Sequence, residues 1–164
     1  MAYTIVAEQP EHAAAVERLP DHAFDPGRHA KTSERVRERG ARFEPSLSRV
    51  ALDDAGDVIG VCRIWRVQAG VELFFLGPLA VDPAAQAAGL GIALTRDAVG
   101  ACRAAGGNGV VCVGADRFFR PLGFSVVPTD RLTLPGPVDS ARLLWCELKP
   151  GAFEQARGRL EAPG

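Results

Sequence analysis

Three β-rich runs, separated by short turns, occupy the middle of the chain. Leu47–Asp53 and Val58–Val67 flank a turn-forming cluster at residues 54–57, which predicts a hairpin. Val71–Val81 is a third, long strand that a Gly-Pro pair at 77–78 interrupts near its end. Because proline cannot donate a ladder hydrogen bond, we expect the strand to bulge or to leave its neighbour at this pair.

The hydrophobic period then changes from that of a strand to that of a helix. Gly89–Ala105 predicts a helix whose apolar stripe comprises Leu90, Leu94, Ala98, Ala101 and Ala105. Two glycines at 106–107 are a stop signal. The continuous apolar run Val110–Val113 is typical of a parallel strand buried on both faces. Strand, helix and strand together predict a β-α-β unit.

The two ends of the chain carry shorter elements. At the N-terminal end we expect a strand at Tyr3–Ala7 and two helices at Glu11–Leu19 and Thr32–Arg39, joined by a loop at Pro20–Arg28. At the C-terminal end we expect two strands, at Gly123–Val127 and Leu143–Leu148. Thr32 or Ser33 is the expected N-cap of the second helix. The predicted order is β-α-α-β-β-β-α-β-(short α)-β-β, without internal repeat or linker.

Composition and charge narrow the class of protein. A chain of 164 residues predicts one domain over residues 1–164. The formal charge of −1 lacks the basic excess of nucleic-acid binders. No apolar run reaches the ~20 residues of a membrane-spanning helix, and the N-terminus lacks the pattern of a signal peptide. We expect a cytoplasmic protein with no nucleic-acid or membrane partner.

The four cysteines support the same expectation. None belongs to a C-x-x-C pair, and three lie inside apolar runs; they are Cys62, Cys102, Cys112 and Cys146. Buried free thiols in a reducing compartment explain them better than disulfides or zinc.

The segment from Leu79 to Leu94 carries the candidate chemistry. A strand ends there, a short loop follows, and Gly89 and Gly91 open the helix. The first turn of a helix has amide groups without intrahelical partners, and its dipole adds partial positive charge, so it attracts anions. The glycines, and the small residues Ala87 and Ala88, leave room for a phosphate.

Three kinds of phosphate-binding loop compete for this segment. A Walker loop needs a Gly-Lys dipeptide, which the chain lacks. A dinucleotide loop reads G-x-G-x-x-G, but the register from Gly89 ends on Leu94. The coenzyme A loop of acetyltransferases reads Q/R-x-x-G-x-G/A, and the residues from Gln86 to Gly91 match every fixed position. A glycine-punctuated helix start without any ligand is the structural alternative.

On these residues the chain resembles the GNAT superfamily of N-acetyltransferases, in a branch with a G-P-L-A-V strand end at residues 77–81. The resemblance covers about residues 3–152, with further blocks at 23–28, 31–32, 37–38, 134–138, 143–145 and 148–151. It implies an α/β fold, the acyl-CoA N-acyltransferase (GNAT) fold, with a mixed, mostly antiparallel seven-stranded sheet and a central splay. The splay lies between the strands matching Val71–Val81 and Val110–Gly114.

The resemblance also implies a cosubstrate and a reaction. Acetyl-CoA pairs with main-chain groups matching Leu79 and Val81, and its pyrophosphate lies on the amides matching Gln86, Ala87, Ala88, Gly89, Leu90, Gly91 and Ile92. A small-molecule or peptide amine attacks the thioester directly, without a metal, and family members often form homodimers. Two other classes stay open: a catalytically weak acyl-CoA sensor, and a structural partner protein with a vestigial loop.

Three carboxylates are candidates for accepting the proton of the amine. Glu72 lies on the strand that the family uses for a carboxylate base, although an exposed strand-end carboxylate is the simpler explanation. Glu147 and Asp116 are weaker candidates, and water is the remaining one.

The expected proton donor to the leaving thiolate is missing. The branch pattern has two adjacent tyrosines where this chain has Phe118 and Phe119, and Tyr3 is its single tyrosine. A phenyl ring cannot donate a proton, so the thiolate, with a thiol pKa of about 8.5, leaves unaided or another group serves.

Other polar and aromatic features receive structural interpretations. The chain lacks the G-x-S-x-G elbow that would turn His12, His22 or His29 toward hydrolase chemistry. The alternating charges at 34–39 predict a solvated helix face, and Trp65 and Trp145 are predicted to be core residues.

Overall fold

The computed structural model describes residues 2–19 and 28–164. The helices and strands are, in chain order, β1 (Thr4–Ala7), η1 (Pro10–His12), α1 (Ala13–Arg18), α2 (Arg28–Glu38), β2 (Arg42–Phe43), β3 (Arg49–Leu52), β4 (Val58–Gln68), β5 (Glu72–Val81), η2 (Pro83–Ala88), α3 (Leu90–Ala104), β6 (Gly109–Val113), α4 (Asp116–Phe119), η3 (Arg120–Leu122), β7 (Ser125–Val126), β8 (Leu132–Thr133), η4 (Ser140–Arg142), β9 (Leu143–Glu147), η5 (Ala152–Gln155) and β10 (Gly158–Arg159). The expected loop Pro20–Arg28 lies almost entirely outside the described residues.

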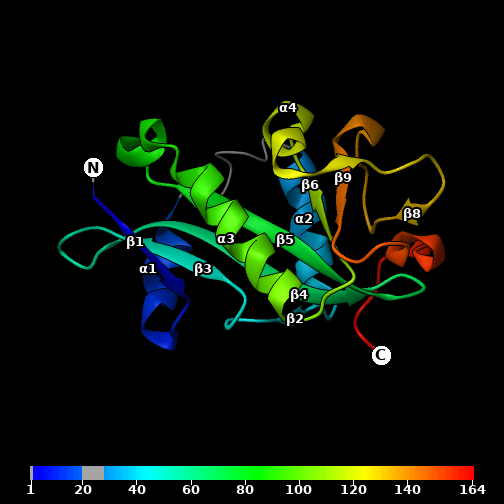
Figure 1. The fold of residues 1–164 in the computed structure, drawn as a ribbon, viewed down its shortest axis with the longest axis horizontal. Coiled ribbons are helices and arrows are strands. Elements are labelled where there is room, and N and C mark those ends of the chain that lie inside the picture. Colours follow the sequence, from blue (N-terminus) through cyan, green and yellow to red (C-terminus); the bar gives the residue numbers. More distant parts are fainter. Residues whose placement is uncertain (1, 20–27) are drawn as a thin grey trace.

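The main sheet is mixed and mostly antiparallel, as predicted. Its strands run in the order β1-β3-β4-β5-β6-β9-β7, and β2 pairs with β4 beside this path (Figure 1). The pair β5 and β6 is parallel, joined by α3, which confirms the β-α-β unit. All five residues of β6 are buried, as expected for a strand covered on both faces.

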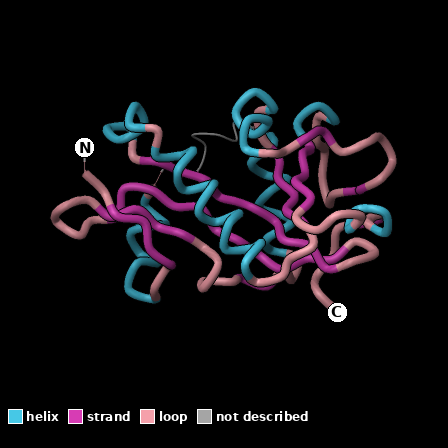
Figure 2. Tube along the Cα trace, in the orientation of Figure 1, coloured by secondary structure: helices cyan, strands magenta, loops and turns pink. Residues whose placement is uncertain are grey.

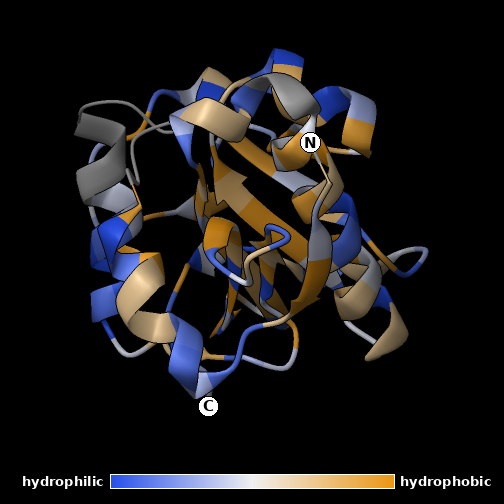
Figure 3. Cartoon of the chain, turned by 90° about the vertical axis from the view of Figure 1, so that its left-hand side faces the viewer, coloured by the Kyte–Doolittle hydropathy of each residue, from blue (hydrophilic) through white to orange (hydrophobic). Residues whose placement is uncertain are grey.

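Helices cover both faces of this sheet. In Figures 1 and 2, α3 crosses the front of the sheet, while α1 and α2 lie behind it. Leu90 and Leu94 of α3 pack on one core, whereas Val16 of α1 and Val36 of α2 belong to separate cores on the opposite face. Figure 3 shows hydrophobic strands between helices with hydrophilic outer turns. No helix among the described residues is long and apolar enough to span a membrane.

The close approach of α3 depends on a strand position without a side chain. A Cβ atom at Gly60 of β4 would lie 2.8 Å from Cδ1 of Leu94 and 3.3 Å from Cδ2 of Leu90. Glycine at position 60 therefore lets the helix sit directly on the strand.

The buried row of α3 differs from the apolar stripe predicted from the sequence. Leu90, Leu94 and Ala98 are buried as predicted, but the row continues to Cys102, while Ala101 is half-buried and Ala105 is exposed. The reason is geometric: successive i+4 steps advance around the helix axis, so the buried row is inclined and follows the crossing angle of α3 over the sheet.

The expected capping role of Thr32 is wrong. Helix α2 starts at Arg28, so Thr32 and Ser33 are interior positions and both are buried. The Thr32 hydroxyl donates a 2.5 Å hydrogen bond to the carbonyl of Pro137, in the loop before η4. The Thr32 hydroxyl therefore binds the distant loop at Pro137 instead of capping the start of α2.

Three two-residue strands, β2, β8 and β10, were not predicted, because such short runs carry no period. Parallel β8 and β10 form a second small sheet. The segment between β9 and β10 closes one core: Phe153 stacks on Trp145 with ring centroids 4.0 Å apart, and Trp145 is a core residue as predicted.

Candidate functional site

Strand β5 changes its register and loses one neighbour along its second half. Opposite β4, Cys62 pairs with Leu79 and Ile64 with Leu76, so the Gly-Pro pair at 77–78 faces a single residue. This confirms the predicted bulge, and the Gly77–Pro78 peptide bond is cis. On the other side, pairing with β6 stops after Phe75 and Val111. Beyond that point the two strands diverge, as a central splay requires.

The orientation of the free edge of β5 follows from its ladder. The amide of Asp82 donates to the carbonyl of Ile59 directly opposite, at 2.8 Å. Because hydrogen-bonded and non-bonded pairs alternate along an antiparallel ladder, the main-chain groups of Leu79 and Val81 point away from β4. No described strand pairs with this stretch on its β6 side, so Leu79 and Val81 present their peptide groups to the splay.

A compact turn connects this edge to α3. The Asp82 side chain accepts a 2.9 Å hydrogen bond from the amide of Ala84 and starts the 3-10 turn η2. The Gln86 side chain donates back to the carbonyl of Val81 at 3.3 Å. Gly89 ends η2 with a φ of 71°, which only glycine adopts readily, and no atom lies within 4 Å of a Cβ built there. Glycine 89 is therefore required by backbone conformation, and the space above it is open.

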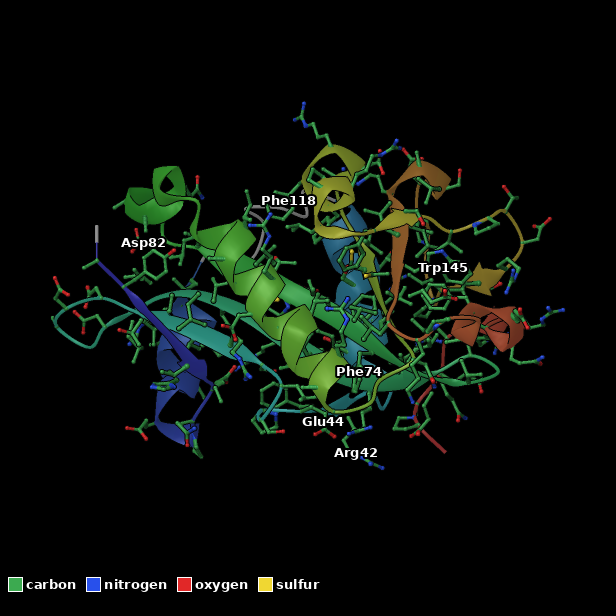
Figure 4. The ribbon with its side chains drawn as sticks, in the orientation of Figure 1. Arg42, Glu44, Phe74, Asp82, Phe118 and Trp145 are labelled. Carbon is green, nitrogen blue, oxygen red and sulfur yellow. The ribbon has the colours of Figure 1, made fainter. Side chains whose placement is uncertain are left out.

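The start of α3 offers unpaired donors next to the splay. The first intrahelical bond runs from the amide of Ala93 to the carbonyl of Gly89, at 3.2 Å. The amides of Leu90, Gly91 and Ile92 precede it and have no partner within the helix. They form an anion-binding terminus at the end of β5 where Asp82 is labelled in Figure 4, while Phe74 marks the paired end.

A cavity of about 310 Å³ lies on the opposite face of the sheet, beside the bulge. Its floor is β4 and β5, its walls are α1 and α2, and it is lined by Val16, Glu17, Leu19, Glu34, Arg37, Glu38, Arg63, Trp65 and Pro78. The alternating charges at 34–39, predicted to be a solvated face, partly line this cavity instead. Only the tertiary placement of α2 over the bulge explains this.

Ion pairs hold the floor of the cavity. Arg63 donates to both carboxylate oxygens of Glu8, at 3.0 and 2.8 Å, and to Glu17 at 2.8 Å. Burial lowers the pKa of Arg63, but its hydrogen bonds and charge interactions with Glu8 and Glu17 outweigh this effect and leave the pKa raised. The guanidinium is therefore permanently charged and already engaged.

Two side chains contact the bulge from this cavity. Trp65 donates a 2.6 Å hydrogen bond from Nε1 to the carbonyl of Gly77. Arg37 reaches the same residue from α2, since its Nη1 lies 3.3 Å from the position of a Cβ at Gly77. The half-buried Trp65 is thus a cavity residue as well as a core neighbour. The sequence singled out Arg37 only as part of the resemblance block at 37–38, without a role, and no motif joins it to Trp65, because the two residues are far apart along the chain.

The candidate bases take different positions. Glu72 is the exposed first residue of β5, and its carbonyl accepts from Nδ2 of Asn108 at 2.9 Å. Glu147 accepts from the amide of Phe153 at 3.1 Å. Asp116 binds Arg120 through Oδ2 at 2.6 Å, while its buried Oδ1 has no hydrogen-bond partner among the described atoms.

The two phenylalanines of α4 differ in environment. Phe119 is 2% exposed and packs against Phe118 and Phe124, with ring centroids 4.8 and 5.2 Å away. A Cβ at Gly114 would lie 2.5 Å from its ring, so glycine accommodates this aromatic. Phe118 is half-buried at the edge of the same core.

His12, the one histidine whose side chain the structure describes, and the four cysteines take no part in this arrangement. His12 accepts at Nδ1 from the amide of Gln9, His22 lies outside the described residues, and so does the side chain of His29. All four cysteines are free and buried. Within the described ranges no group of three or more His, Cys, Asp or Glu residues has metal-binding geometry.

Comparison with solved structures identifies relatives with the same architecture. A GNAT family N-acetyltransferase (YhbS) from Escherichia coli, in complex with CoA, is 26% identical with a TM-score of 0.79, over 98% of this chain and 89% of that chain. A GNAT family acetyltransferase from Brucella melitensis, in complex with acetyl-CoA, is 27% identical with a TM-score of 0.62, over 93% and 98%. A ribosomal-protein-alanine N-acetyltransferase from E. coli, 18% identical with a TM-score of 0.59 over 90% and 95%, shares the fold.

Sequence comparison points the same way. No curated protein matches the chain significantly. The family model of the acetyltransferase (GNAT) family, however, matches residues 13–124, which include the splay, the turn after β5 and helix α3. This protein therefore belongs to the GNAT family of acetyltransferases.

Proposed function

We propose that this protein is an N-acetyltransferase that transfers the acetyl group of acetyl-CoA to a primary amine, with residues 1–164 acting as one domain. One observation carries the proposal: the unpaired edge of β5 adjoins the anion-binding start of α3. A donor with a peptide-like arm and a pyrophosphate needs both features, side by side. Acetyl-CoA is the acyl donor of this family, and the relatives from E. coli and Brucella melitensis described above were crystallised with CoA and acetyl-CoA, respectively.

Specific groups supply the two parts of this donor site. The outward peptide groups of Leu79 and Val81 pair with the pantetheine arm as a further strand would, the Val81 carbonyl using its second lone pair because the first accepts from Gln86. The pyrophosphate binds along the turn from Gln86 through Ala87 and Ala88 to Gly89, and onto the amides of Leu90, Gly91 and Ile92. Open space above Gly89 suits the approach of a phosphate to the backbone.

The amine enters from the face that carries α1 and α2, where the cavity reaches the bulge of β5. Catalysis then consists mainly of positioning the amine and polarising the thioester carbonyl with strand amides. Glu72 lies five residues before Gly77 of the bulge, roughly 17 Å along an extended strand, and on the α3 side together with Phe74. We propose that it accepts the proton of the amine through a chain of ordered water molecules.

The compartment and assembly complete the proposal. Four buried free thiols suit the reducing cytoplasm. A homodimer agrees with the habit of the family, whereas the net charge of −1 favours neither a nucleic acid nor a membrane surface as partner.

Calorimetric titration with CoA tests the donor site. Gly89→Val forces a side chain into a left-handed conformation, and Gly91→Asp adds a negative charge at the anion site. Gly89→Val should fold and lose CoA affinity by at least about tenfold. Gly91 is buried, so Gly91→Asp is compared only after thermal melting has shown that it is folded, and it should then lose affinity likewise. Gly100→Ala, in the same helix with open space around it, is the matched control and should bind normally. Unchanged affinity in both folded site variants would exclude this assignment.

A binding-only sensor of acyl-CoA is the second candidate, favoured by the absence of a tyrosine at 118 and 119. It predicts CoA binding without release of free CoA from acetyl-CoA over a broad amine panel. Glu72→Gln distinguishes Glu72 from water as the proton acceptor. If Glu72 is the base, kcat/KM of the variant falls by about 10²-fold, most strongly at neutral pH. An unchanged pH–rate profile leaves water as the acceptor.

A further inference from the structure

The cavity between α1, α2 and the sheet is placed to receive the acceptor. Pro78 of the bulge lies in its floor, and Arg37 and Trp65 contact Gly77, so the cavity adjoins the part of β5 from which β6 diverges. A volume of about 310 Å³ matches the lower end of small-ligand pockets, which run to roughly 1,000 Å³. The cavity therefore holds one small molecule.

The charges of the cavity determine what kind of molecule that is. Three carboxylates and two guanidiniums line it. One of these guanidiniums, Arg63, is bound to the buried carboxylate of Glu8 from below, as well as to Glu17. Among the described residues, and with Glu8 beneath the lining included, four carboxylates are matched by two guanidiniums, which leaves an excess of negative charge.

The two lining carboxylates that do not pair with Arg63 lie on α2. Glu34 and Glu38 are one helical turn apart, so their side chains share a face of the helix. Glu34 is half-buried, Glu38 is exposed, and neither forms an ion pair within the described part of the chain. A carboxylate that lines a narrow cavity attracts a cation more strongly than one in bulk water, because fewer water molecules screen it.

The second guanidinium of the lining, that of Arg37, also lies on α2, but it is directed to the bulge. Arg37 places its guanidinium beside Gly77, next to the position where the acyl group would lie. A cation there favours the neutral form of an attacking amine, which is the nucleophilic form. The carboxylates of α2 are left to hold a second, non-reacting charge of the acceptor.

We propose that the acceptor is a small aliphatic primary amine that carries a second positive charge, that is, a diamine or polyamine. This inference rests on the proposed N-acetyltransferase function. One amino group reacts at the bulge while the distal ammonium binds Glu34 and Glu38, and the half-buried Trp65 offers apolar surface to the methylene chain.

The reaction balances without a further reactant. The neutral nitrogen attacks the thioester carbonyl carbon, a C–N bond forms and the C–S bond breaks. The nitrogen loses one proton to the base, and the thiolate takes up one proton from solvent. The products are the monoacetylated diamine, which keeps its distal charge, and CoA.

Three acceptors of equal chain length test the proposal. Pentane-1,5-diamine, pentylamine and 6-aminohexanoate present the same attacking amine with a distal positive charge, no charge or a negative charge. Release of CoA should give a kcat/KM for the diamine at least about tenfold above that for pentylamine, and lowest for the amino acid. A lysine-containing peptide tests whether a macromolecular amine is preferred instead.

Variants of α2 assign the preference to the cavity. Glu34→Gln should reduce the diamine-to-pentylamine ratio about tenfold, and Glu34→Lys should turn the preference toward 6-aminohexanoate. Glu154→Gln, an exposed carboxylate in η5 outside the cavity lining, is the control and should leave the ratio unchanged. CoA titration and thermal melting show that each variant is folded with its donor site intact.

The outcomes separate this inference from the function on which it rests. If pentylamine, 6-aminohexanoate or the peptide is acetylated as well as or better than the diamine, the charge assignment of the cavity is wrong, but the protein is still an N-acetyltransferase. A diamine preference that survives Glu34→Lys also overturns it. CoA binding without turnover of any amine overturns both proposals and favours the sensor.

Discussion

Tyrosine substitution at the two phenylalanines of α4 tests whether the enzyme works without a proton donor. The structure predicts opposite results at adjacent positions. Phe118 is half-buried at the edge of its core, whereas Phe119 is 2% exposed and packed between two other rings. Phe118→Tyr should therefore fold normally and raise kcat.

The expected gain from Phe118→Tyr is limited by the leaving group. General acids contribute typically about 10²–10⁴-fold, but a thiol with an ordinary pKa of about 8.5 leaves readily, so we expect an increase of only about tenfold. The KM for acetyl-CoA should stay unchanged, because the added hydroxyl lies away from the start of α3.

The cost of Phe119→Tyr follows from its packing. An unpaired buried hydroxyl costs about 1–3 kcal/mol, and overpacking against neighbours such as Gly114 costs about 1–3 kcal/mol more. The melting temperature should fall by roughly 5–20 °C, without any gain in kcat.

Steady-state kinetics with saturating amine, together with thermal melting, measure both effects. The reasoning is refuted if Phe119→Tyr is as stable as the parent and faster, because its ring edge would then face the splay. If both variants are stable and neither is faster, proton donation to the thiolate does not limit turnover.

Two further predictions concern stability. Gly60→Ala presses a Cβ against Leu94 and should cost about 1–3 kcal/mol in urea unfolding, whereas Gly100→Ala on the outer face of α3 should be neutral or stabilising; equal stability of both would contradict the close helix–strand contact. Burial raises the pKa of Cys102 to about 12 and that of Cys62 further, so both thiols stay protonated in the folded chain after the unfolded chain has ionised. The stability that these two protonated thiols contribute is complete below about pH 8.5 and is lost as pH rises toward 12, by about 1.4 kcal/mol per pH unit for each thiol. Urea unfolding at pH 7.5 and 9.5 should show this loss, and Cys102→Ala should make the free energy of unfolding fall less steeply with pH. A free energy of unfolding that does not change with pH would contradict the burial of the thiols.

Local pattern was sufficient for the elements that carry a strong period. The strand Val71–Val81, the helix after Gly89 and the apolar run Val110–Val113 all occur within one or two residues of their predicted bounds. Their residues already satisfy the geometry they adopt: β-branched and aromatic residues in the strands, a left-handed glycine at the helix start, and a proline at the bulge.

Local pattern failed where a distant segment decided the outcome. Thr32 looked like a helix cap, but the loop at Pro137 binds its hydroxyl. The charges of α2 looked solvated, but α1 and the bulge of β5 enclose part of them. In both cases the partner lies far along the sequence, so no window of neighbouring residues contains the information.

The proposed donor site and the proposed acceptor site therefore differ in how they are encoded. The turn from Gln86 to Ile92 is contiguous, because it needs only a strand end, a left-handed residue and a helix start, and the sequence by itself determined it. The cavity draws on α1, α2, β4 and β5, and its charge depends on Glu8 pairing with Arg63, 55 residues away. Only the tertiary structure decided which carboxylates were neutralised and which remained available, because burial and ion pairing are properties of neighbours in space.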